Sequence, residues 1–537
     1  MPGATDVADL VASAAAESPE RLALVEVGGR SLTWARLEDE VARVAHGLNR
    51  LHVVGGHRVM LVLGNRLEFV TTYLGTLRAH AVAVPVNPAT GAYDLARKIA
   101  DSGSRLIVAD AETASHAREA VAMVRAALAG TPLPGAGDLE PELLTRAKDP
   151  HVVVIGEGRQ DETTYAELVS GEPAEFVPVA DPERLAALLY TAGTSGRPRA
   201  AMLTHRALLA NIEQVADTDP PMMHGDDVVL GVLPLFHVYG LNAVLGSVLR
   251  HRAKLVLVDR FDPEGTLDLI DDEAISVLPL APAVFGHWIG RDQVKERLGP
   301  VRLVLSGSAV LAAEVMERFT AETGLEVHQG YGLTEAAPVV TTTMRGAPSL
   351  PGSVGRPLTG VEVRLVDEHT GHLEGDDPGE IQVRGPNLFS GYWPDGADGP
   401  GDDGWWSTGD VGYRDPTGDL FLVDRVRDML VVSGFNVYPS EVEDVITEVE
   451  GVTGAAVIGV DDPASGQAVV AYVVSDGPPD EVEAAVRQHV EARLARFKRP
   501  SRIEVLDSLP VTVTGRVEKG RLRGIERRRA LGLIGED

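Results

Sequence analysis

The chain has 537 residues, of which 44% are hydrophobic, and a formal net charge of -30. This length exceeds what one hydrophobic core usually supports, so we expect two or more domains. Because the chain has no cysteine, disulfides, thiolate metal sites and a cysteine nucleophile are excluded, and any reacting thiol belongs to a substrate. The acidic balance disfavours binding to nucleic acid and to anionic membranes, so an anionic ligand needs a local cationic pocket.

Neither a signal peptide nor a membrane-spanning stretch is predicted. The N-terminus MPGATDVADL lacks a basic start and an apolar run, and Gly, Pro, Asn or charged residues interrupt the apolar stretches elsewhere. We therefore expect a cytoplasmic protein without membrane insertion.

Before Gly352 the chain alternates between helical patterns and short apolar strands. An amphipathic helix is predicted over 37–51, and strand patterns follow at RVMLVLG, AVAVPVNP, SRLIVAD, VVLGVLP, AKLVLVD, ISVLPLAP and VRLVLSG. This alternation predicts an α/β fold with parallel sheets covered by helices. The segment 128–171 is rich in Pro, Gly and acidic residues, and we expect it to form a surface loop.

The pattern changes near Gly352, where short alternating strands predict a small β-barrel-like or antiparallel subdomain. An acidic, glycine-rich loop, DGADGPGDDG, then precedes the sequence WWSTGD. Further on, a succession of strand, strand, helix and strand predicts a compact α+β unit of about a hundred residues. We therefore predict an N-terminal domain over 1–424 and a small C-terminal lid domain over 425–537.

A glycine-rich loop, TAGTSGRPR, follows the apolar run 185–190. Its glycines allow backbone N–H groups to converge on an anion, although the spacing differs from that of the Walker nucleotide loop. The next helix cap comes only at Thr204, so a phosphate would lie on loop amides rather than on a helix dipole. An ordinary glycine turn explains the loop equally well when it is taken alone. The residues expected to bind phosphate are Thr191, Gly193, Thr194, Ser195 and Gly196.

Two further motifs carry groups suited to a nucleotide. QGYGLTEAAP places the ring of Tyr331 between glycines and puts Thr334 beside Glu335. A ring stacks on a base, a hydroxyl donates to phosphate, and a carboxylate can hold Mg²⁺ among phosphate oxygens. Asp410, at the end of WWSTGD, can accept two hydrogen bonds from ribose hydroxyls, and Arg425 can clamp sugar or phosphate.

These motifs, in this order, resemble the adenylate-forming superfamily of acyl-CoA synthetases, carrier-protein-loading adenylation domains and luciferases. The likeness runs nearly from end to end and includes YTAGTSGRPRAAMLTH, LPLFHVYG, SGSAVL, QGYGLTEAAP, RGPNLFSGYW, SGFNVYPSEVE and the tail LPVTVTGRVEKGRLR. The resemblance implies an acid–thiol ligase with a mobile C-terminal lid and two half-reactions. First a carboxylate attacks the α-phosphate of ATP and releases pyrophosphate; then a thiol attacks the acyl-adenylate and releases AMP.

The resemblance also implies a role for each site residue. Tyr331 would stack on adenine, Thr334 would bind the α-phosphate, and Glu335 would bind Mg²⁺. Asp410 with Arg425 would hold the ribose. Additional nucleotide-binding residues are Gly307, Ser308, Ala309 and Gly332. The implied cofactors are ATP or acyl-AMP, CoA and Mg²⁺.

Two residues would serve the thiol step. His237, in FHVYG, would lie where the acyl group meets the incoming pantetheine, whereas without the resemblance a satisfied core histidine is the simpler interpretation. Gly434 would belong to the loop that guides the thiol, and a plain turn glycine is its alternative. For the acyl pocket we expect Val238, Gly240 and the stretch LAPAVFGHW, which indicates an apolar acyl group.

Two motifs depart from the family pattern. The phosphate loop generally reads Thr-Ser-Gly-Thr-Thr-Gly-x-Pro-Lys-Gly, and this chain has Ala192, Ser195, Arg199 and Ala200 at four of those places. The tail motif generally reads Ser/Thr-Gly-Lys, whose lysine bridges the substrate carboxylate and the α-phosphate, and here it ends in Arg516. A guanidinium is a broad planar fork, whereas an ammonium is a compact point donor. We therefore predict an enzyme that makes acyl-CoA from acyl-adenylate and CoA, with a slow or missing adenylation step.

Several interpretations stay open beside this one. Arg516 or nearby Lys519 can still perform adenylation, which would make the protein a full two-step synthetase. The acceptor can be a separate carrier protein instead of CoA, and the chain can also be a catalytically silent adenylate binder. The basic tail RVEKGRLRGIERRR is either a solvated helix face or a contact for the phosphates of CoA. The expected partners are a small carboxylic acid or its acyl-adenylate, CoA, and a separate adenylating enzyme or carrier protein.

Overall fold

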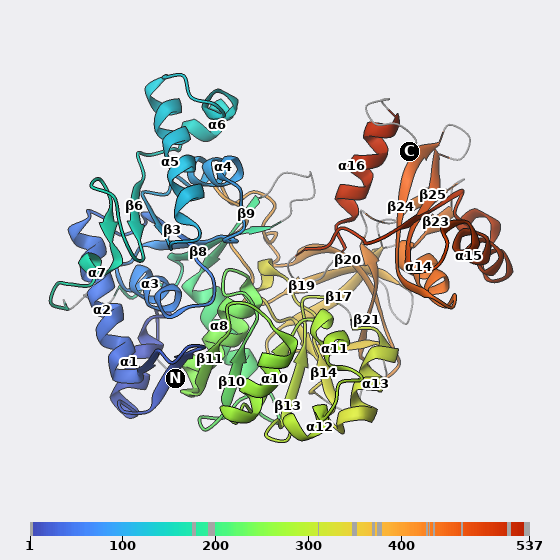
Figure 1. Ribbon diagram of the computed structural model, residues 1–537, viewed down its shortest axis with the longest axis horizontal. Coiled ribbons are helices and arrows are strands. Elements are labelled where there is room, and N and C mark those ends of the chain that lie inside the picture. Colours follow the sequence, from blue (N-terminus) through green and yellow to red (C-terminus); the bar gives the residue numbers. More distant parts are fainter. Residues whose placement is uncertain are drawn as a thin grey trace.

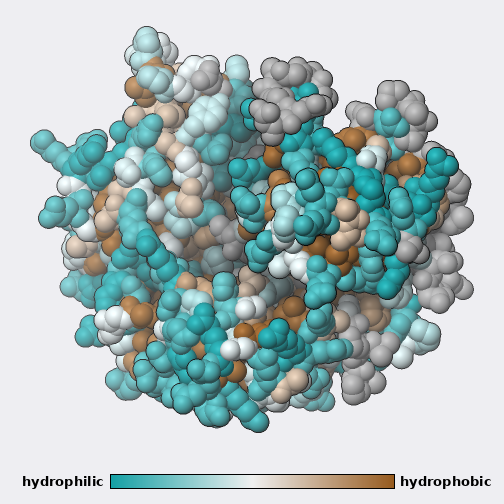
Figure 2. Space-filling model, turned by 45° about the vertical axis from the view of Figure 1, so that its right-hand side comes forward, coloured by the Kyte–Doolittle hydropathy of each residue, from teal (hydrophilic) through white to brown (hydrophobic). Residues whose placement is uncertain are grey.

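The computed structural model describes residues 4–173, 179–191, 199–309, 311–345, 352–367, 371–372, 378–425, 428, 430–432, 435–462, 466–512 and 517–530. Figure 1 shows a large body and, at its upper right, a smaller unit formed by the C-terminal residues. The visible face of the molecule in Figure 2 is mostly hydrophilic, in line with the net charge of -30. No helix in the described part of the chain is long and apolar enough to cross a membrane.

Two seven-stranded sheets organise the large body, and both are parallel except for one terminal antiparallel pair. The first sheet has the order β7 (Thr163–Thr164), β6 (His151–Val154), β5 (Leu106–Ala109), β3 (Arg58–Val62), β4 (Val82–Pro85), β8 (Leu185–Thr191), β9 (Arg199–Thr204). The second has the order β14 (Val327–Gln329), β13 (Leu303–Ser306), β12 (Val277–Leu280), β10 (Val228–Gly231), β11 (Lys254–Leu257), β1 (Leu22–Glu26), β2 (Ser31–Thr33).

Helices fill the space between these sheets and cover their outer faces. The inner layer contains α1 (Asp9–Glu17), α2 (Trp34–Arg50), α3 (Leu67–Arg78), α7 (Tyr165–Leu168), α8 (His205–Ala216), η2 (Tyr239–Gly246) and α9 (Ser247–His251). The first sheet is covered outside by α4 (Ala92–Ser102), α5 (Ala114–Ala129) and α6 (Pro141–Leu144). The second is covered by α10 (Pro263–Asp272), α11 (Pro282–Trp288), α12 (Val294–Arg297) and α13 (Ala313–Thr323). The predicted α/β fold is confirmed.

The helix predicted over 37–51 is α2, and it begins three residues earlier. The side chain of Thr33 caps it by accepting a hydrogen bond from the Arg36 N–H at 3.3 Å. Its apolar residues recur at helical spacing and are buried between the sheets: Leu37, Val41, Val44, Ala45 and Leu48. Burial of this face anchors the helix.

The segment 128–171, expected to be a surface loop, is in part a core element. Residues Val152–Val154 of β6 are buried, and β6 pairs in parallel with β5. The expectation was wrong because β6 has only four residues, so its apolar run is hidden among the polar residues around it.

The third sheet is antiparallel, as predicted after Gly352. It has the order β15 (Thr341–Thr342), β16 (Ser353–Pro357), β21 (Leu420–Arg425), β20 (Trp406–Arg414), β19 (Gly379–Arg384), β17 (Glu362–Asp367), β18 (Gly371–His372). Three short turns are η1 (Ala136–Asp138), η3 (Thr334–Ala336) and η4 (Arg496–Lys498).

The C-terminal unit is the predicted α+β domain. Its sheet has the order β23 (Phe435–Val437), β22 (Leu430–Val432), β25 (Gly466–Ser475), β24 (Val452–Asp462), and β26 (Arg502–Leu506) pairs in parallel with β25. Its helices are α14 (Pro439–Thr447), α15 (Pro479–Arg493) and α16 (Lys519–Ala530). Since β21 belongs to the third sheet and β22 to the C-terminal one, the chain passes between the units near 426–429. The boundary at 424/425 stays a prediction.

Candidate active site

A cavity of about 2860 Å³ is lined by residues of both the large body and the C-terminal unit. Every residue that was predicted for the nucleotide, Mg²⁺ or thiol and whose side chain is described lines it. These residues are Thr191, His237, Gly307, Ser308, Ala309, Tyr331, Gly332, Thr334, Glu335 and Asp410. The other predicted residues, Gly193, Thr194, Ser195, Gly196, Gly434, Arg516 and the side chain of Arg425, lie outside the described residues. The structure thus brings side chains from five distant stretches of sequence into one cavity.

The glycine-rich loop joins two antiparallel strands at the edge of the first sheet. Thr191 at the end of β8 faces Arg199 at the start of β9, and both line the cavity. The next helix, α8, begins only after β9, where the Thr204 hydroxyl accepts a hydrogen bond from the Ala207 N–H at 3.2 Å. The helix N-terminus is therefore occupied by its own cap, and loop amides remain the predicted phosphate ligands.

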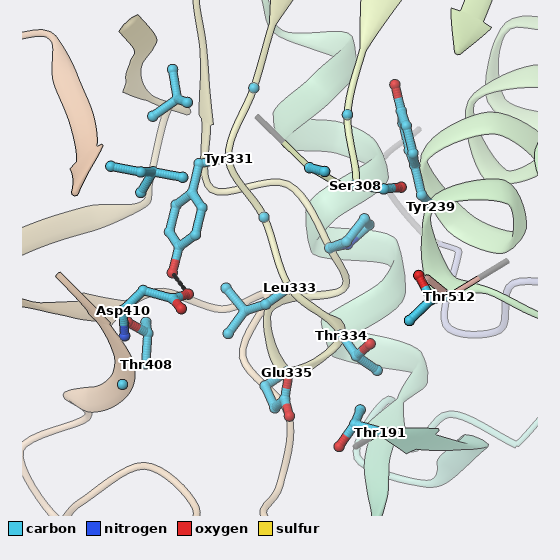
Figure 3. A pocket seen from close by; sticks show the side chains of 18 of the residues that line it. Thr191, Tyr239, Ser308, Tyr331, Leu333, Thr334, Glu335, Thr408, Asp410 and Thr512 are labelled. Carbon is cyan, nitrogen blue, oxygen red and sulfur yellow. Dashed lines mark hydrogen bonds between the residues drawn. The ribbon is translucent and has the colours of Figure 1, made fainter. Parts of the chain in front are cut away.

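Tyr331 and Asp410 meet across the cavity, although they are far apart in the sequence. The Tyr331 hydroxyl donates to Asp410 Oδ2 at 2.7 Å, as the dashed line in Figure 3 shows. The Asp410 N–H in turn donates to Thr408 Oγ1 at 3.1 Å. These bonds fix the position of a carboxylate beside an aromatic ring, an arrangement suited to a ribose and its base.

The loop after β14 needs glycine at position 332. Gly332 forms a bridge with Val339, and a Cβ at this position would lie 2.3 Å from the Pro338 carbonyl oxygen. Any side chain would therefore push the two arms of the loop apart. Since Tyr331 precedes this glycine and Thr334 follows it, the tight crossing holds both at the cavity wall.

Glu335 presents a buried carboxylate at the cavity wall. Its Oε1 accepts a hydrogen bond from the Tyr392 hydroxyl at 2.6 Å, and its backbone oxygen accepts one from the Phe389 N–H at 2.9 Å. Burial and the neighbouring Glu335 carboxylate raise the pKa of Tyr392, so the phenol keeps its proton. Among the described residues, no three His, Asp or Glu side chains form a metal site. Glu335 fits Mg²⁺ as a single carboxylate ligand that would need phosphate oxygens and water as the remaining ligands.

His237 lies partly exposed in the cavity. Burial lowers its pKa from 6.5 to about 4, so the imidazole is neutral near pH 7. Nδ1 accepts a hydrogen bond from the Tyr239 N–H at 3.3 Å, which leaves the proton of the neutral ring on Nε2.

This lowered pKa predicts a loss of stability in acid. Between the ordinary pKa of 6.5 and the folded pKa of about 4, the unfolded chain binds a proton that the folded chain does not, so the free energy of unfolding falls as the pH falls. The His237 contribution is about 3 kcal/mol over this range, at about 1.4 kcal/mol per pH unit. Urea unfolding at several pH values should show a shallower acid loss in His237→Asn. The exposed residue His116, changed to Asn as a control, should leave the slope unchanged.

Gly307 lies against the ring of Tyr239. A Cβ at position 307 would be 2.6 Å from Cε1 of that ring, and both residues line the cavity. Ser308 next to it adopts a φ of 74°, and its hydroxyl is buried with no hydrogen-bond partner in the described structure. The backbone thus passes very close to an aromatic wall of the cavity.

Gly307→Ala is expected to displace the ring of Tyr239, which follows the expected acyl-pocket residue Val238, and thereby to reduce turnover of the acyl substrate about tenfold, because overpacking at a well-packed contact costs about 1–3 kcal/mol. Gly286→Ala is the matched control, since no heavy atom lies within 4 Å of the added methyl group. Steady-state kinetics with acyl chains of increasing size should show the largest loss for the bulkiest chain. Equal losses for all chains would contradict a role of this contact in the acyl pocket.

The expected acyl-pocket residues are only partly correct. Val238 lines the cavity, whereas Gly240 and residues 280–288 do not. Gly240 is packed against the backbone of Pro234, and α11 covers the outer face of the second sheet, where Phe285 and Trp288 are buried. The apolar side chains that do line the cavity include Val215, Met222, Met223, Val244 and Val277.

Sequence reasoning also missed two polar residues of the cavity. Glu380 Oε1 accepts a hydrogen bond from the Gly409 N–H at 3.2 Å, next to Asp410. Tyr392, the partner of Glu335, belongs to the family-like stretch RGPNLFSGYW, so this motif could have identified it as a site residue. No signal marks Glu380, because only the register of β19 with β20 brings it to the cavity.

The C-terminal unit contributes the opposite wall. Thr512 and Val517 flank residues 513–516, and both line the cavity; Figure 3 shows the Thr512 side chain there. Val511 and Val517 form an isolated antiparallel bridge. Several basic residues of α16 are paired with carboxylates: Lys519 Nζ lies 2.8 Å from Glu443 Oε1, and Arg529 binds Glu504. These pairs favour a structural role for this face of α16 over a contact with the phosphates of CoA.

Comparisons with known proteins identify the family of this chain. A family model described as AMP-binding enzyme matches residues 11–393, and one described as AMP-binding enzyme C-terminal domain matches residues 441–516. The long-chain-fatty-acid–CoA ligase of Bacillus subtilis is 32% identical over 96% of this chain and 93% of its own length. The 4-coumarate–CoA ligase 5 of Oryza sativa is 31% identical over 96% of this chain and 93% of its own.

The fold is also that of solved structures in the same family. ATP-bound MatB from Rhodopseudomonas palustris superposes with a TM-score of 0.84 and 31% identity, covering 97% of this chain and 99% of that one. The family uses ATP and CoA. The chain therefore belongs to the AMP-binding enzyme family and is an AMP-forming acid–thiol ligase of the acyl- and aryl-CoA ligase type.

Proposed function

We propose that this ligase forms an acyl-CoA thioester from an acyl-adenylate and CoA and releases AMP, and that its ATP-dependent adenylation step is slow or lost. In the proposed step, the CoA sulfur attacks the carbonyl carbon of the mixed anhydride. The new C–S bond replaces the C–O bond to phosphate, AMP leaves with the bonding electrons, and the thiol proton passes to solvent. The proposed acid has an apolar acyl group, and the proposed location is the cytoplasm.

The observation that carries this proposal concerns the lysines of the C-terminal region. Thr512 and Val517, the nearest described residues on either side of the tail motif, line the cavity. Lys498 and Lys519 are the only lysines after residue 425 in the sequence. Lys498 Nζ lies 2.5 Å from Glu441 Oε1, and Lys519 Nζ lies 2.8 Å from Glu443 Oε1. Neither replaces the ammonium that the family places at position 516 without breaking its ion pair.

The proposed nucleotide roles are those that the family resemblance implies for these residues, most of which line the cavity. We assign the adenine to the ring of Tyr331 and to Gly307, Ser308 and Ala309, and the ribose to Asp410 with Arg425. Thr334 and the loop that starts at Thr191 would hold phosphate. Glu335 would hold Mg²⁺, which supplies charge neutralisation of phosphate when bound. Gly434 would guide the thiol towards the carbonyl near His237.

The apolar part of the cavity supports a hydrophobic acid. Met222, Met223 and the valines at 215, 244 and 277 line it. The relatives are named for a long-chain fatty acid and for 4-coumarate. We propose CoA as the acceptor; a separate carrier protein is the alternative acceptor, and a separate adenylating enzyme would supply the acyl-adenylate.

A full two-step synthetase is the second candidate, and the composition favours it. Lysine is rare in this chain, since its only lysines are Lys98, Lys148, Lys254, Lys295, Lys498 and Lys519. If lysine has been replaced by arginine throughout the chain, Arg516 reflects this general replacement and does not indicate that the adenylation step was lost. In that case the guanidinium itself would bridge the carboxylate and the α-phosphate.

Two separate assays distinguish the candidates. One tube holds the protein with Mg-ATP and a panel of fatty, cinnamic and benzoic acids, and pyrophosphate is measured. The other holds the synthetic acyl-adenylates of the same acids with CoA, and acyl-CoA is measured. We expect rapid acyl-CoA formation in the second tube and pyrophosphate release at least about a hundredfold slower in the first, as for the loss of a well-placed electrostatic contact. Equal rates would contradict the proposal.

Two further experiments test for a silent adenylate binder and for a carrier-loading enzyme. Calorimetric binding of an acyl-adenylate without CoA-dependent turnover would show a silent binder. Purified carrier protein that outcompetes CoA for the acyl group would show a carrier-loading enzyme.

A further inference from the structure

The described residues of the large body offer very little positive charge to a polyphosphate. Among its described residues that line the cavity, Arg199 is the only lysine or arginine. The same wall carries four carboxylates, those of Glu335, Glu380, Asp398 and Asp410. ATP carries more negative charge than an adenylate. A carboxylate that already pairs with the Arg199 guanidinium therefore lowers the affinity for ATP more than the affinity for AMP.

The guanidinium of Arg199 is already engaged by two groups. Its Cζ lies 3.9 Å from the centre of the Tyr392 ring, which is a cation–π stacking distance. Its Nη1 lies 2.6 Å from Asp398 Oδ2. Since the Tyr392 hydroxyl donates to Glu335, the stack also ties Arg199 to the carboxylate proposed to hold Mg²⁺. These two contacts hold the Arg199 side chain at the start of β9, directly after the glycine-rich loop, with its guanidinium against Asp398.

The acidic, glycine-rich loop 395–404 holds Asp398 at this place. Asp398 adopts a φ of 54°, in the left-handed region, and its carbonyl oxygen accepts a hydrogen bond from Trp406 Nε1 at 2.9 Å. The Tyr392 N–H donates to the Ala397 carbonyl oxygen at 3.0 Å. A Cβ on Gly391 would lie 2.0 Å from the Gly396 carbonyl oxygen, so the loop is closely packed against itself. The backbone is thus folded to bring one carboxylate to Arg199.

We propose that Asp398 is a specificity-determining residue that occupies the guanidinium of Arg199 at the end of the phosphate loop, so that the site favours nucleotides with a single phosphate over ATP. The β- and γ-phosphates of ATP, bound beside Thr191 and Arg199 at the cavity wall, would compete with Asp398 for the guanidinium. An adenylate carries neither phosphate and leaves the pair intact. The inference rests on the proposed nucleotide site. It gives a second reason, independent of Arg516, for a preference for acyl-adenylate over ATP.

The expected change in ATP affinity depends on how exposed the Arg199–Asp398 ion pair is to solvent. The Asp398 side chain is 72% exposed and that of Arg199 is 27% exposed, so solvent screens the pair. Exposed ion pairs of this kind change an equilibrium by up to about fivefold at low salt. Because salt further screens exposed charges, the preference should shrink as the ionic strength rises.

The test is the binding of Mg-ATP and of AMP, measured by calorimetry on the full chain without an acid substrate. Asp398→Asn removes the charge and tolerates the left-handed backbone, since asparagine adopts it as readily as aspartate. Asp402→Asn is the matched control, because it removes one charge from the same loop and Asp402 has no contact with Arg199 among those observed. Asp398→Gly is a second variant that removes the whole side chain at a φ that favours glycine.

We expect both Asp398 variants to tighten Mg-ATP binding by about three- to fivefold and to leave AMP binding within about twofold. Asp402→Asn should change neither ligand by more than about twofold. In an Arg199→Ala background, the gain from Asp398→Asn should become smaller, because the competition for the guanidinium is gone.

Three results would overturn the inference: equal changes for AMP and ATP, an equal gain from Asp402→Asn, or an undiminished gain in the Arg199→Ala background. These binding measurements are independent of turnover. If the unmodified protein releases pyrophosphate rapidly, the proposed loss of adenylation fails, whereas the role of Asp398 is still decided by the ratio of the two affinities.

Discussion

Arg516→Lys is expected to release pyrophosphate from an acid and ATP about a hundredfold faster than the unmodified protein. The physical reason is the geometry of the cation, because a compact ammonium fits between two oxygens in near-attack contact, whereas a planar guanidinium does not. A well-placed electrostatic contact in a transition state contributes about 3 kcal/mol, which corresponds to a factor of about a hundred in rate. Acid-dependent pyrophosphate release under saturating ATP is the measurement.

Two controls accompany this variant. Arg528→Lys makes the same change on an exposed position of α16 and should leave both half-reactions unchanged. The rate of acyl-CoA formation from synthetic acyl-adenylate should stay within about twofold in Arg516→Lys, because this step does not need a cation between carboxylate and phosphate. An unchanged rate of pyrophosphate release in Arg516→Lys would mean that arginine already performs adenylation, and the two-step synthetase would then be the better description.

Asp410→Ala should weaken the binding of acyl-adenylate by about a hundredfold and slow both half-reactions accordingly. A carboxylate that accepts two hydrogen bonds from ribose hydroxyls contributes about 1.5 kcal/mol or more for each bond. The Tyr331 hydroxyl, which donates to Asp410 Oδ2 at 2.7 Å, would also lose its partner. The measurements are calorimetric affinity for acyl-adenylate or AMP and kcat/KM for acyl-CoA formation.

Tyr331→Phe separates the ring from the hydroxyl at the same site. The ring remains for the adenine, and only the bond that orients Asp410 is lost, so we expect about a threefold to tenfold loss. Asp402→Ala, which removes an exposed carboxylate of the loop 395–404, should bind AMP normally. A loss in Tyr331→Phe as large as in Asp410→Ala would indicate that the carboxylate acts mainly on the protein and not on the ribose.

The Arg516 and Asp398 variants address different parts of the same preference. Arg516 concerns the reaction of a bound acid with ATP, and Asp398 concerns the affinity for ATP itself. One substitution changes the rate of the chemical step and the other changes the affinity for ATP. Their effects on kcat/KM for adenylation should therefore add in free energy, unless both side chains contact the same oxygen of the ligand. The double variant Arg516→Lys with Asp398→Asn is therefore the form of this protein in which adenylation should be fastest.

Much of the architecture followed from local patterns in the sequence. Strand runs such as RVMLVLG and VRLVLSG are continuous apolar stretches, as expected for parallel strands buried on both faces, and they became β3 and β13. Spacing at helical period placed α2 correctly, because periodicity is a property of neighbouring residues. The motifs likewise located the described site residues, since each motif carries its own functional groups.

Which of these groups meet was decided only by the tertiary structure. Arg199 and Asp398 are separated by 199 positions, and no local pattern in either stretch predicts their ion pair. The stretch 280–288 is apolar like a ligand pocket, yet α11 buries Phe285 and Trp288 on the outer face of the second sheet. The sequence determines which residue types are available along the chain, whereas the packing of sheets and loops determines which charges lie close enough to interact, because electrostatic and van der Waals contacts depend on distance in space.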